Sequence, residues 1–112
     1  MAKDVSQFTV QVTETIMDAM MKITANKHRV VIVLDGTKVV GTVSDGDIRR
    51  ALLKDMLQIT PVEKIMNLNC RTTTERDPQR LAALLAKEQV TVLPVVSEDN
   101  ELVDVGIAYE PF

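Results

Sequence analysis

The chain has 112 residues, of which 46% are hydrophobic, and carries a formal net charge of −3. Its length predicts a single domain, the lack of a basic excess argues against nucleic acid as a partner, and no apolar run reaches the roughly 18 residues that a membrane span needs. One cysteine, Cys70, excludes an internal disulfide, and together with an opening segment that has no apolar stretch it predicts a cytoplasmic protein.

The first half of the chain predicts an α/β unit. Apolar residues recur at helical spacing after an opening strand, and either Thr13 or Thr15 is the candidate N-cap of that helix. Two β-branched runs around a turn then predict a strand pair, and a second helix follows. The expected order is an opening strand, a helix in residues 13–26, strands in 29–35 and 38–43, and a helix from Ser44 to Leu53.

The second half predicts a similar order of elements. A connector, residues 54–69, holds one short helical turn at 62–66. The next helix has Asp77 as its candidate N-cap and Pro78 at its first position. The further elements expected here are a Thr-rich strand in 70–74, a helix in 77–89, and strands in 90–96 and 101–107.

The two halves repeat each other. Laying Pro94 on Val31 shifts the residue number by 63, and the same shift lays Leu102 on Val39, whereas the apolar positions of the helices match best at a shift of 64. We therefore expect one inserted residue between helix and strand in the second half. Two β-α-β-β-α units of about 55 residues each are too small to bury their own sheets and helices, so they are expected to pack about a pseudo-twofold axis with a cleft between them.

Domain boundaries follow from the repeat. The chain is expected to be one module whose first unit takes about residues 1–56 and whose second takes about 57–112. The second unit stops at Phe112, where the first unit continues into its last helix. The chain is either cut from a longer protein or a naturally short module, and we favour the first because an unfinished unit would leave an apolar strand poorly covered.

The repeated pattern resembles a CBS-domain pair, also called a Bateman module. The resemblance rests on "VGTVSDGDIRRALL" in the first half, "VTVLPVV" in the second and "VEKIM" in the connector, and it extends from Phe8 to Tyr109. It implies a non-catalytic regulatory module that binds AMP, ADP, ATP or S-adenosylmethionine between its two motifs, forms homodimers and controls a neighbouring or fused domain. The segments "GTVSDGDIRRALL" and "LPVV" with "LVD" are most similar to the pair found N-terminal to some sugar-phosphate nucleotidyltransferases.

The stretch "SDGD" has two interpretations. Ser44 followed by Asp47 is the spacing of a capping box, and acidic residues in a first helical turn suit the helix dipole. The resemblance implies instead that Ser44 and Asp47 bind the ribose of an adenosine ligand, whose two vicinal hydroxyls can both donate to a carboxylate. Helix N-terminal amides can meet a phosphate, and Arg49 or Arg50 could add positive charge there. Asp45, in the same helical turn, is also a candidate ligand-binding residue.

The resemblance also implies a base-facing wall at the start of the strands. It consists of Val30 and Val31 in the first motif and Leu93 and Pro94 in the second. As side chains these residues are predicted to be core, although the backbone of Val31 can bond a base edge. In the second motif Ile107 and Glu110 stand where Ser44 and Asp47 do, so we expect one good and one degenerate site.

Other classes of function remain as alternatives. The same fold could serve only as a ligand-free dimerisation module, or Asp45 and Asp47 could hold a sparse magnesium site in an enzyme. Cys70 and His28 are too few for a structural zinc site, and a buried cysteine with a surface histidine is the simpler interpretation of that pair. We therefore predict no catalytic residue, no metal and no required cofactor.

Overall fold

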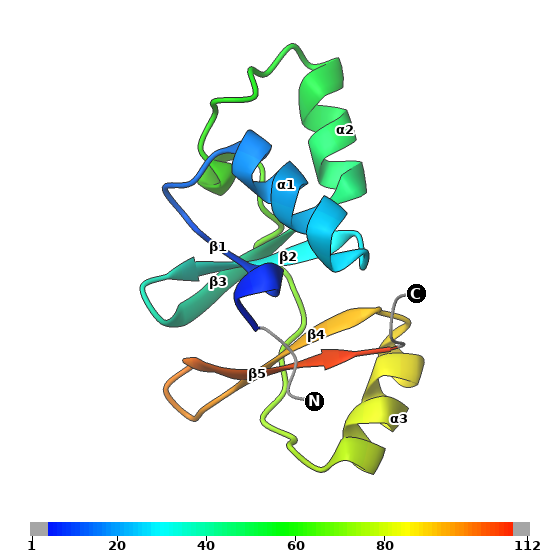
Figure 1. The fold of residues 1–112 in the computed structure, drawn as a ribbon. Helices are drawn as coiled ribbons and strands as arrows, with labels where there is room; N and C mark the ends of the chain where they lie inside the picture. The colour runs from blue at the N-terminus through cyan, green and yellow to red at the C-terminus, as the bar shows by residue number, and fades with distance from the viewer. Residues whose placement is uncertain (1–4, 109–112) are drawn as a thin grey trace.

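Two β-sheets face each other in the middle of the molecule, with helices on their outer sides (Figure 1). They are seen in a computed structural model that describes residues 5–108. The first sheet has the strand order β1-β2-β3, and the second has β4-β5. The elements in chain order are η1 (Val5–Phe8), β1 (Thr9–Gln11), α1 (Ile16–Asn26), β2 (Val30–Asp35), β3 (Lys38–Ser44), α2 (Asp45–Leu53), η2 (Val62–Lys64), α3 (Pro78–Glu88), β4 (Val92–Val96) and β5 (Leu102–Ile107).

The α/β prediction is confirmed, including its shared core. Strand residues alternate between the two faces of a sheet, so Val31 and Val33 of β2 pack toward α1 and α2, whereas Ile32 and Leu34 face the second sheet. The cluster between the sheets takes residues from both halves: Phe8, Ile32, Leu34, Val39, Val92, Val96 and Val105. Neither half therefore has a core of its own on this side.

Helix α3 covers the outer face of the second sheet. Leu81 and Leu85 pack against Leu93 and Val95 of β4. The helix also lies so close to β5 that a Cβ built at Gly106 would be 2.9 Å from the Leu81 side chain, which only glycine avoids.

Every α-helix begins at a residue whose side chain caps it. Thr15 and Ser44 each accept a hydrogen bond from the backbone N–H three residues later, within a complete capping box. Asp77 caps α3, with Pro78 as its first residue. The predicted caps are confirmed, and of the two threonines considered for α1 the cap is Thr15.

Reciprocal hydrogen bonds mark the pseudo-twofold axis. The Val39 N–H donates to the carbonyl of Asn100 (3.1 Å), and the Leu102 N–H donates to the carbonyl of Thr37 (2.9 Å). With the shift of 63, Asn100 corresponds to Thr37 and Leu102 corresponds to Val39. The two hydrogen bonds are therefore equivalent by the repeat, each running from one motif to the other. The bridge between Lys38 and Glu101 lies between them and has the same shift. The predicted repeat therefore holds in β3 and β5.

The predicted site of the inserted residue is wrong. Val30 pairs with Ser44 and Val92 pairs with Ile107, so the shift from β2 to β4 is 62 while that from β3 to β5 is 63. The shift between the helix caps Thr15 and Asp77 is also 62. The extra residue lies in the turn between β4 and β5, because a hairpin turn accepts a residue without moving the helix or the core. Matching similar letters in apolar strands does not fix their register.

The expected strand in residues 70–74 is also wrong. Only Thr73 pairs there, in a single parallel bridge to Val95, and the segment before it departs from the sheet. The second sheet is therefore two-stranded within residues 5–108. Within this range no helix is long and apolar enough to cross a membrane. The predictions on Tyr109, Glu110 and Phe112 lie outside the described residues.

Candidate functional site

The candidate ribose residues form the capping box at the start of α2. The Asp47 Oδ2 accepts the Ser44 backbone N–H (2.9 Å) and the Ser44 hydroxyl (3.0 Å), and the Asp47 N–H donates to Ser44 Oγ (3.2 Å). A carboxylate oxygen accepts about two hydrogen bonds, so Oδ2 is fully used by the cap. Any ligand hydroxyl must therefore approach Oδ1.

The second oxygen of Asp47 is held by an arginine. Arg50 Nη2 lies 2.6 Å from Asp47 Oδ1, and the arginine side chain folds back over the helix start, where a Cβ on Gly46 would be 3.2 Å from Nη1. The Arg50 side chain is 65% exposed and that of Asp47 only 18%. Because an exposed ion pair of this kind contributes about 0.3–0.5 kcal/mol, Arg50 can leave Oδ1 at little cost.

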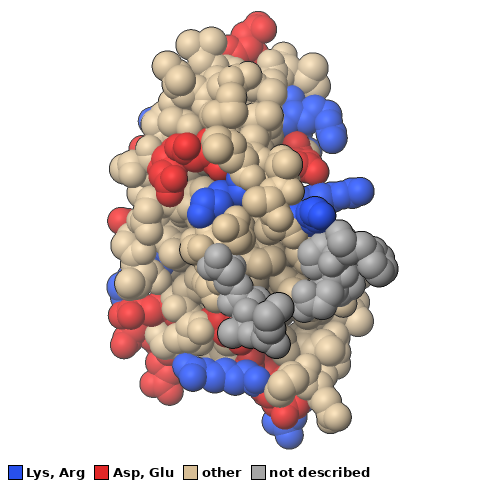
Figure 2. Space-filling view, viewed as in Figure 1, with Lys and Arg blue, Asp and Glu red and all other residues tan. Residues whose placement is uncertain are grey.

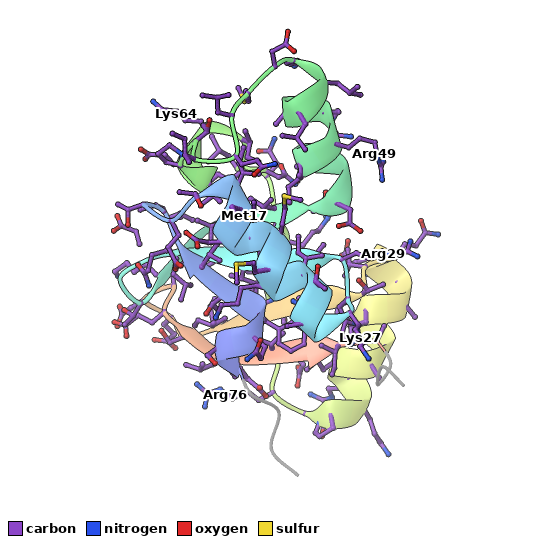
Figure 3. The ribbon with its side chains drawn as sticks, turned by 45° about the horizontal axis from the view of Figure 1, so that its top comes forward. Met17, Lys27, Arg29, Arg49, Lys64 and Arg76 are labelled. Carbon is purple, nitrogen blue, oxygen red and sulfur yellow. The ribbon has the colours of Figure 1, made fainter. Side chains whose placement is uncertain are left out.

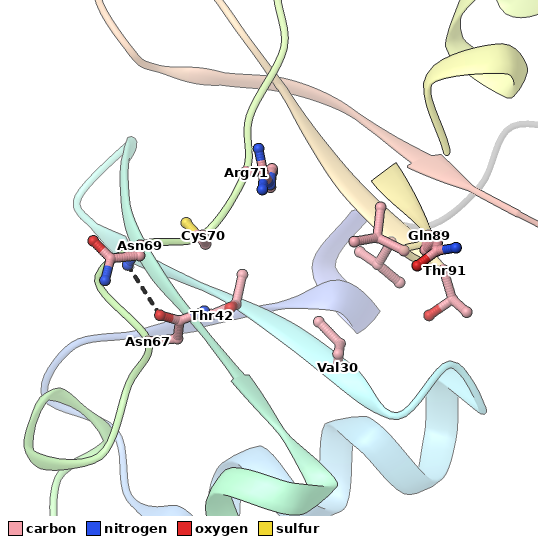
Figure 4. A pocket seen from close by; sticks show the side chains of 10 residues that line it. Val30, Thr42, Asn67, Asn69, Cys70, Arg71, Gln89 and Thr91 are labelled. Carbon is pink, nitrogen blue, oxygen red and sulfur yellow. Dashed lines mark hydrogen bonds between the residues drawn. The ribbon is translucent and has the colours of Figure 1, made fainter. Parts of the chain in front are cut away.

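A cavity of about 430 Å³ opens between the two halves (Figure 4). Its volume lies in the range of small-molecule pockets, which is roughly 300–1,000 Å³. The walls come from β2 and β3, from the linker before Thr73, and from the loop between α3 and β4. The lining residues are Val30, Thr42, Asn67, Asn69, Cys70, Arg71, Gln89, Val90, Thr91 and Val92.

The capping box borders this cavity without lining it. Ser44 is the ladder partner of Val30 and stands two residues after Thr42 on the same strand, and both of these residues line the cavity. Residues two apart on a strand share a face, so Ser44 continues the β2–β3 wall. The strand pairing thus brings Ser44 next to Val30 at the edge of the cavity, and Asp47 is hydrogen-bonded to Ser44.

The other predicted wall residues are in the core. Val31 is fully buried toward the helices, Leu93 packs against α3, and Pro94 is also fully buried. Their side chains line no part of the cavity, which leaves only their backbone for a ligand. Their contact with a ligand stays a prediction.

The loop between α1 and β2 corrects one prediction. His28, expected at the surface, is fully buried, with its ring 5.6 Å from that of Phe8 between centroids. Lys27 and Arg29 on either side have left-handed backbones, with φ of 61° and 68°, and turn His28 inward between them. The Asn26 side chain fixes the loop by accepting the His28 N–H (2.7 Å).

Basic side chains gather near the start of α2. The Asp45 N–H donates to the carbonyl of Arg29 (3.0 Å), which ties the α1–β2 loop to the helix N-terminus. Arg29 and Arg49 point outward on the same side of the molecule (Figure 3). On the face seen in Figure 2, Lys and Arg side chains cluster at mid-height and to the right, among scattered carboxylates. These arginines give the surface beside the helix start a positive charge that can attract an anion.

Sequence reasoning missed most of the cavity wall. Three amide side chains contribute to it, those of Asn67, Asn69 and Gln89, and the Asn69 N–H donates to Asn67 Oδ1 (3.0 Å). The linker is held there by mutual hydrogen bonds between the backbones of Asn67 and Thr42. The one available signal was the non-helical segment between the turn at 62–66 and Thr73, in which we interpreted residues 67–69 as connector and residues 70–74 as a strand.

Two lining residues have distinct chemistry. Burial raises the pKa of the Cys70 thiol. Near neutral pH this side chain is therefore an apolar part of the cavity wall and not a nucleophile. Arg71 Nε lies 3.2 Å from Glu88 Oε2, and its side chain is 67% exposed at the mouth of the cavity. Among the described residues, no three His, Cys, Asp or Glu side chains come together in a way that could hold a metal ion.

Comparison with known proteins matches this geometry. Residues 1–54 match the family model of the CBS domain. The chain is 33% identical over 96 residues to the arabinose 5-phosphate isomerase GutQ of Escherichia coli K12, an alignment that covers 83% of this chain and 30% of that protein. The chain therefore spans less than a third of the length of the curated relatives it matches.

Solved structures share the whole fold. The CBS domains of a transcriptional regulator from Streptococcus pneumoniae align with a TM-score of 0.75 and 18% identity, covering 96% of this chain and 89% of that one. A CBS domain protein from Pyrobaculum aerophilum, complexed with AMP, aligns with a TM-score of 0.69 and 20% identity, covering 88% of this chain and 78% of that one.

Proposed function

Residues 1–54 of this chain are a CBS domain and the chain has the fold of a CBS-domain pair, and from this premise we propose that it is a non-catalytic regulatory module for an adenosine nucleotide. The observation that carries the proposal is the cavity of about 430 Å³ between the motifs, whose β2–β3 wall is continued by Ser44, the hydrogen-bond partner of Asp47. The nucleotide lies in this cavity, and AMP is the simplest candidate.

Each part of a nucleotide has a matching wall. The ribose hydroxyls bind Asp47 Oδ1 once Arg50 has moved away, and Ser44 keeps the carboxylate in place through the capping box. The phosphate lies near the start of α2, where Arg49 and the released Arg50 can pair with it. The base lies along Val30 and Val92, with the amides of the linker at its edge.

The similar proteins support a nucleotide ligand and an enzyme partner. One solved neighbour is complexed with AMP, and the curated relatives carry their matching segment in an isomerase of a sugar phosphate. By analogy this chain controls a neighbouring or fused enzyme that acts on a sugar phosphate. Association with a nucleotidyltransferase stays a prediction, since the relatives named above are isomerases.

The direct experiment is thermal denaturation with ligands. A ligand at a hundredfold its Kd stabilises the folded state by about 2.7 kcal/mol, which raises the Tm of a domain this size by roughly 10 °C. We expect that shift with AMP, ADP, ATP or S-adenosylmethionine, and none with ribose 5-phosphate alone. If none of the adenosine compounds raises the Tm, the proposed function is wrong.

One further observation supports the alternative, a dimerisation module. Large apolar side chains are exposed together on α1, α2 and the connector that follows, which a monomer rarely leaves in contact with water. Three of them, Leu52, Leu57 and Ile59, line a shallow hollow of about 410 Å³. The exposed members are Met17, Met21, Leu52, Leu53, Leu57 and Ile59.

This apolar surface leads to a prediction on assembly. The double variant Leu53→Glu with Ile59→Glu places two negative charges on this surface. The parent side chains are 78% and 74% exposed, so the fold should not change. The variant is expected to convert a homodimer into a monomer. Leu68→Glu is the control, because this leucine is as exposed (71%) but belongs to the linker. Sedimentation velocity checks both variants. A double variant that sediments like the parent dimer would contradict the prediction.

A further inference from the structure

The pseudo-twofold axis gives the open cavity a counterpart on the other side of the core. The loop Gln89–Val92 lines the open cavity, and the shift that relates β2 to β4 lays it on Lys27–Val30. Val10 pairs in parallel with Val33, and Thr73 pairs in parallel with the matching Val95. The linker segment before Thr73 therefore corresponds to the segment before Val10.

The corresponding side chains differ in size and burial. Arg71, two residues before Thr73, corresponds to Phe8, and Val90 corresponds to His28. Arg71 is exposed and Val90 partly exposed at the open cavity, whereas Phe8 is 6% and His28 0% exposed. On β5 the residue matching Thr42 is Val105, which is also fully buried.

The two rings fill the counterpart position. The Phe8 and His28 rings are 5.6 Å apart and tilted by 43°, an arrangement in the range of attractive ring pairs. Phe8 also belongs to the cluster between the sheets with Val92 and Val105, and Val5 and Ile107 pack against that cluster. Thr91, which lines the open cavity, donates its hydroxyl proton to the His28 carbonyl (3.2 Å) and so joins the filled side to the open one.

We propose that Phe8 and His28 permanently plug the second inter-motif position, so that each chain takes up one ligand molecule, in the cavity lined by Arg71 and Val90. The proposal rests on the proposed function for the nature of the ligand, and on the pseudo-symmetry for the number of sites. The two inter-motif positions differ because of the volume of the side chains that occupy them. This difference does not depend on the carboxylate that binds the ligand.

The test copies the plug into the open cavity. Arg71→Phe with Val90→His places the same two side chains at the matching backbone positions, and Arg71→Ala with Val90→Ala is the control that removes the originals without filling the space. Isothermal titration with AMP is expected to give one site per wild-type chain and no detectable binding to the plugged variant. The control loses wall contacts, so it should bind AMP more weakly than the wild type but still saturate at one site. Val90→His alone is the milder variant, should the double one fail to fold in a thermal melt.

A second readout needs no nucleotide. Cys70 lines the cavity, so its reaction with a maleimide, run at alkaline pH where the thiolate forms, reports on access. We expect the plugged variant to react at least about tenfold more slowly than the control, because thiol reactivity follows exposure. Two AMP molecules per wild-type chain, or unchanged maleimide rates in the plugged variant, would overturn the proposal. No AMP binding to the wild type, with Cys70 still shielded in the plugged variant, would overturn the proposed function and leave the plug standing.

Discussion

Replacing Asp47 by alanine is expected to weaken AMP binding at least about 100-fold. A hydrogen bond to a charged group contributes roughly 1.5–3 kcal/mol, and a ribose would make two of them to this carboxylate, while each 1.4 kcal/mol corresponds to about a tenfold change in Kd. Isothermal titration of AMP into the folded variant measures the loss directly. The same variant also loses a helix cap, so a fall in Tm alone does not establish a ligand site.

The chain contains its own control for the capping effect. Asp18 makes the same three contacts with Thr15 at the start of α1, at 2.9, 3.0 and 3.2 Å, as Asp47 makes with Ser44 at the start of α2. Asp18→Ala should therefore cost a similar stability, about 1 kcal/mol, and leave the affinity for AMP unchanged. Only the capping box that borders the cavity is expected to affect both quantities.

The pair of variants separates the two interpretations of "SDGD". If Asp47→Ala and Asp18→Ala lower the Tm equally and both still bind AMP like the parent, Asp47 is a helix cap and no more. Arg50→Ala sharpens the result further. The variant frees Asp47 Oδ1 for the ribose but removes a partner of the phosphate. It should therefore weaken the binding of AMP more than the binding of adenosine, which has no phosphate.

Local chemistry made the helix starts predictable. Thr15, Ser44 and Asp77 act on backbone groups three residues away, so their spacing in the sequence is already their spacing in space. The turn before Lys38, the unbroken apolar run of β2 and the alternating burial along β3 also depend on neighbouring residues alone. The shared core between the sheets followed from the repeat, since neither half is large enough alone.

The cavity depends on contacts that no local pattern encodes. Asn67 reaches the wall because its backbone pairs with that of Thr42, which lies on β3, before the whole of α2 and the connector. His28 is buried because two flanking residues take left-handed backbones, a conformation that Lys and Arg rarely adopt and that their residue types do not indicate. The position of the inserted residue was missed because apolar strands match each other nearly as well one residue out of register.

Ile32→Ala is expected to destabilise the chain by about 2–5 kcal/mol. Ile32 is fully buried in the cluster between the two sheets, and the cost of removing buried methylene groups includes the cavity left behind. Domains of this size have a total unfolding free energy of roughly 5–15 kcal/mol, so the variant should lose a large share of it. Urea denaturation measures the loss, and Ile32→Val, expected at about 0.5–1.5 kcal/mol, is the graded control.

The same experiment tests whether the two motifs fold as one unit. Ile16 is also fully buried, but it packs only in the first motif, between α1 and its sheet. A two-stranded sheet with one helix is marginal alone, so Ile16→Ala should speed amide exchange in β4 and β5 as much as Ile32→Ala does, by more than about 100-fold for a loss of about 3 kcal/mol. If Ile16→Ala leaves exchange in β4 and β5 unchanged, the second motif is stable without the first. The cavity between them would then be a joint between two separate bodies and could not couple a ligand to the whole module.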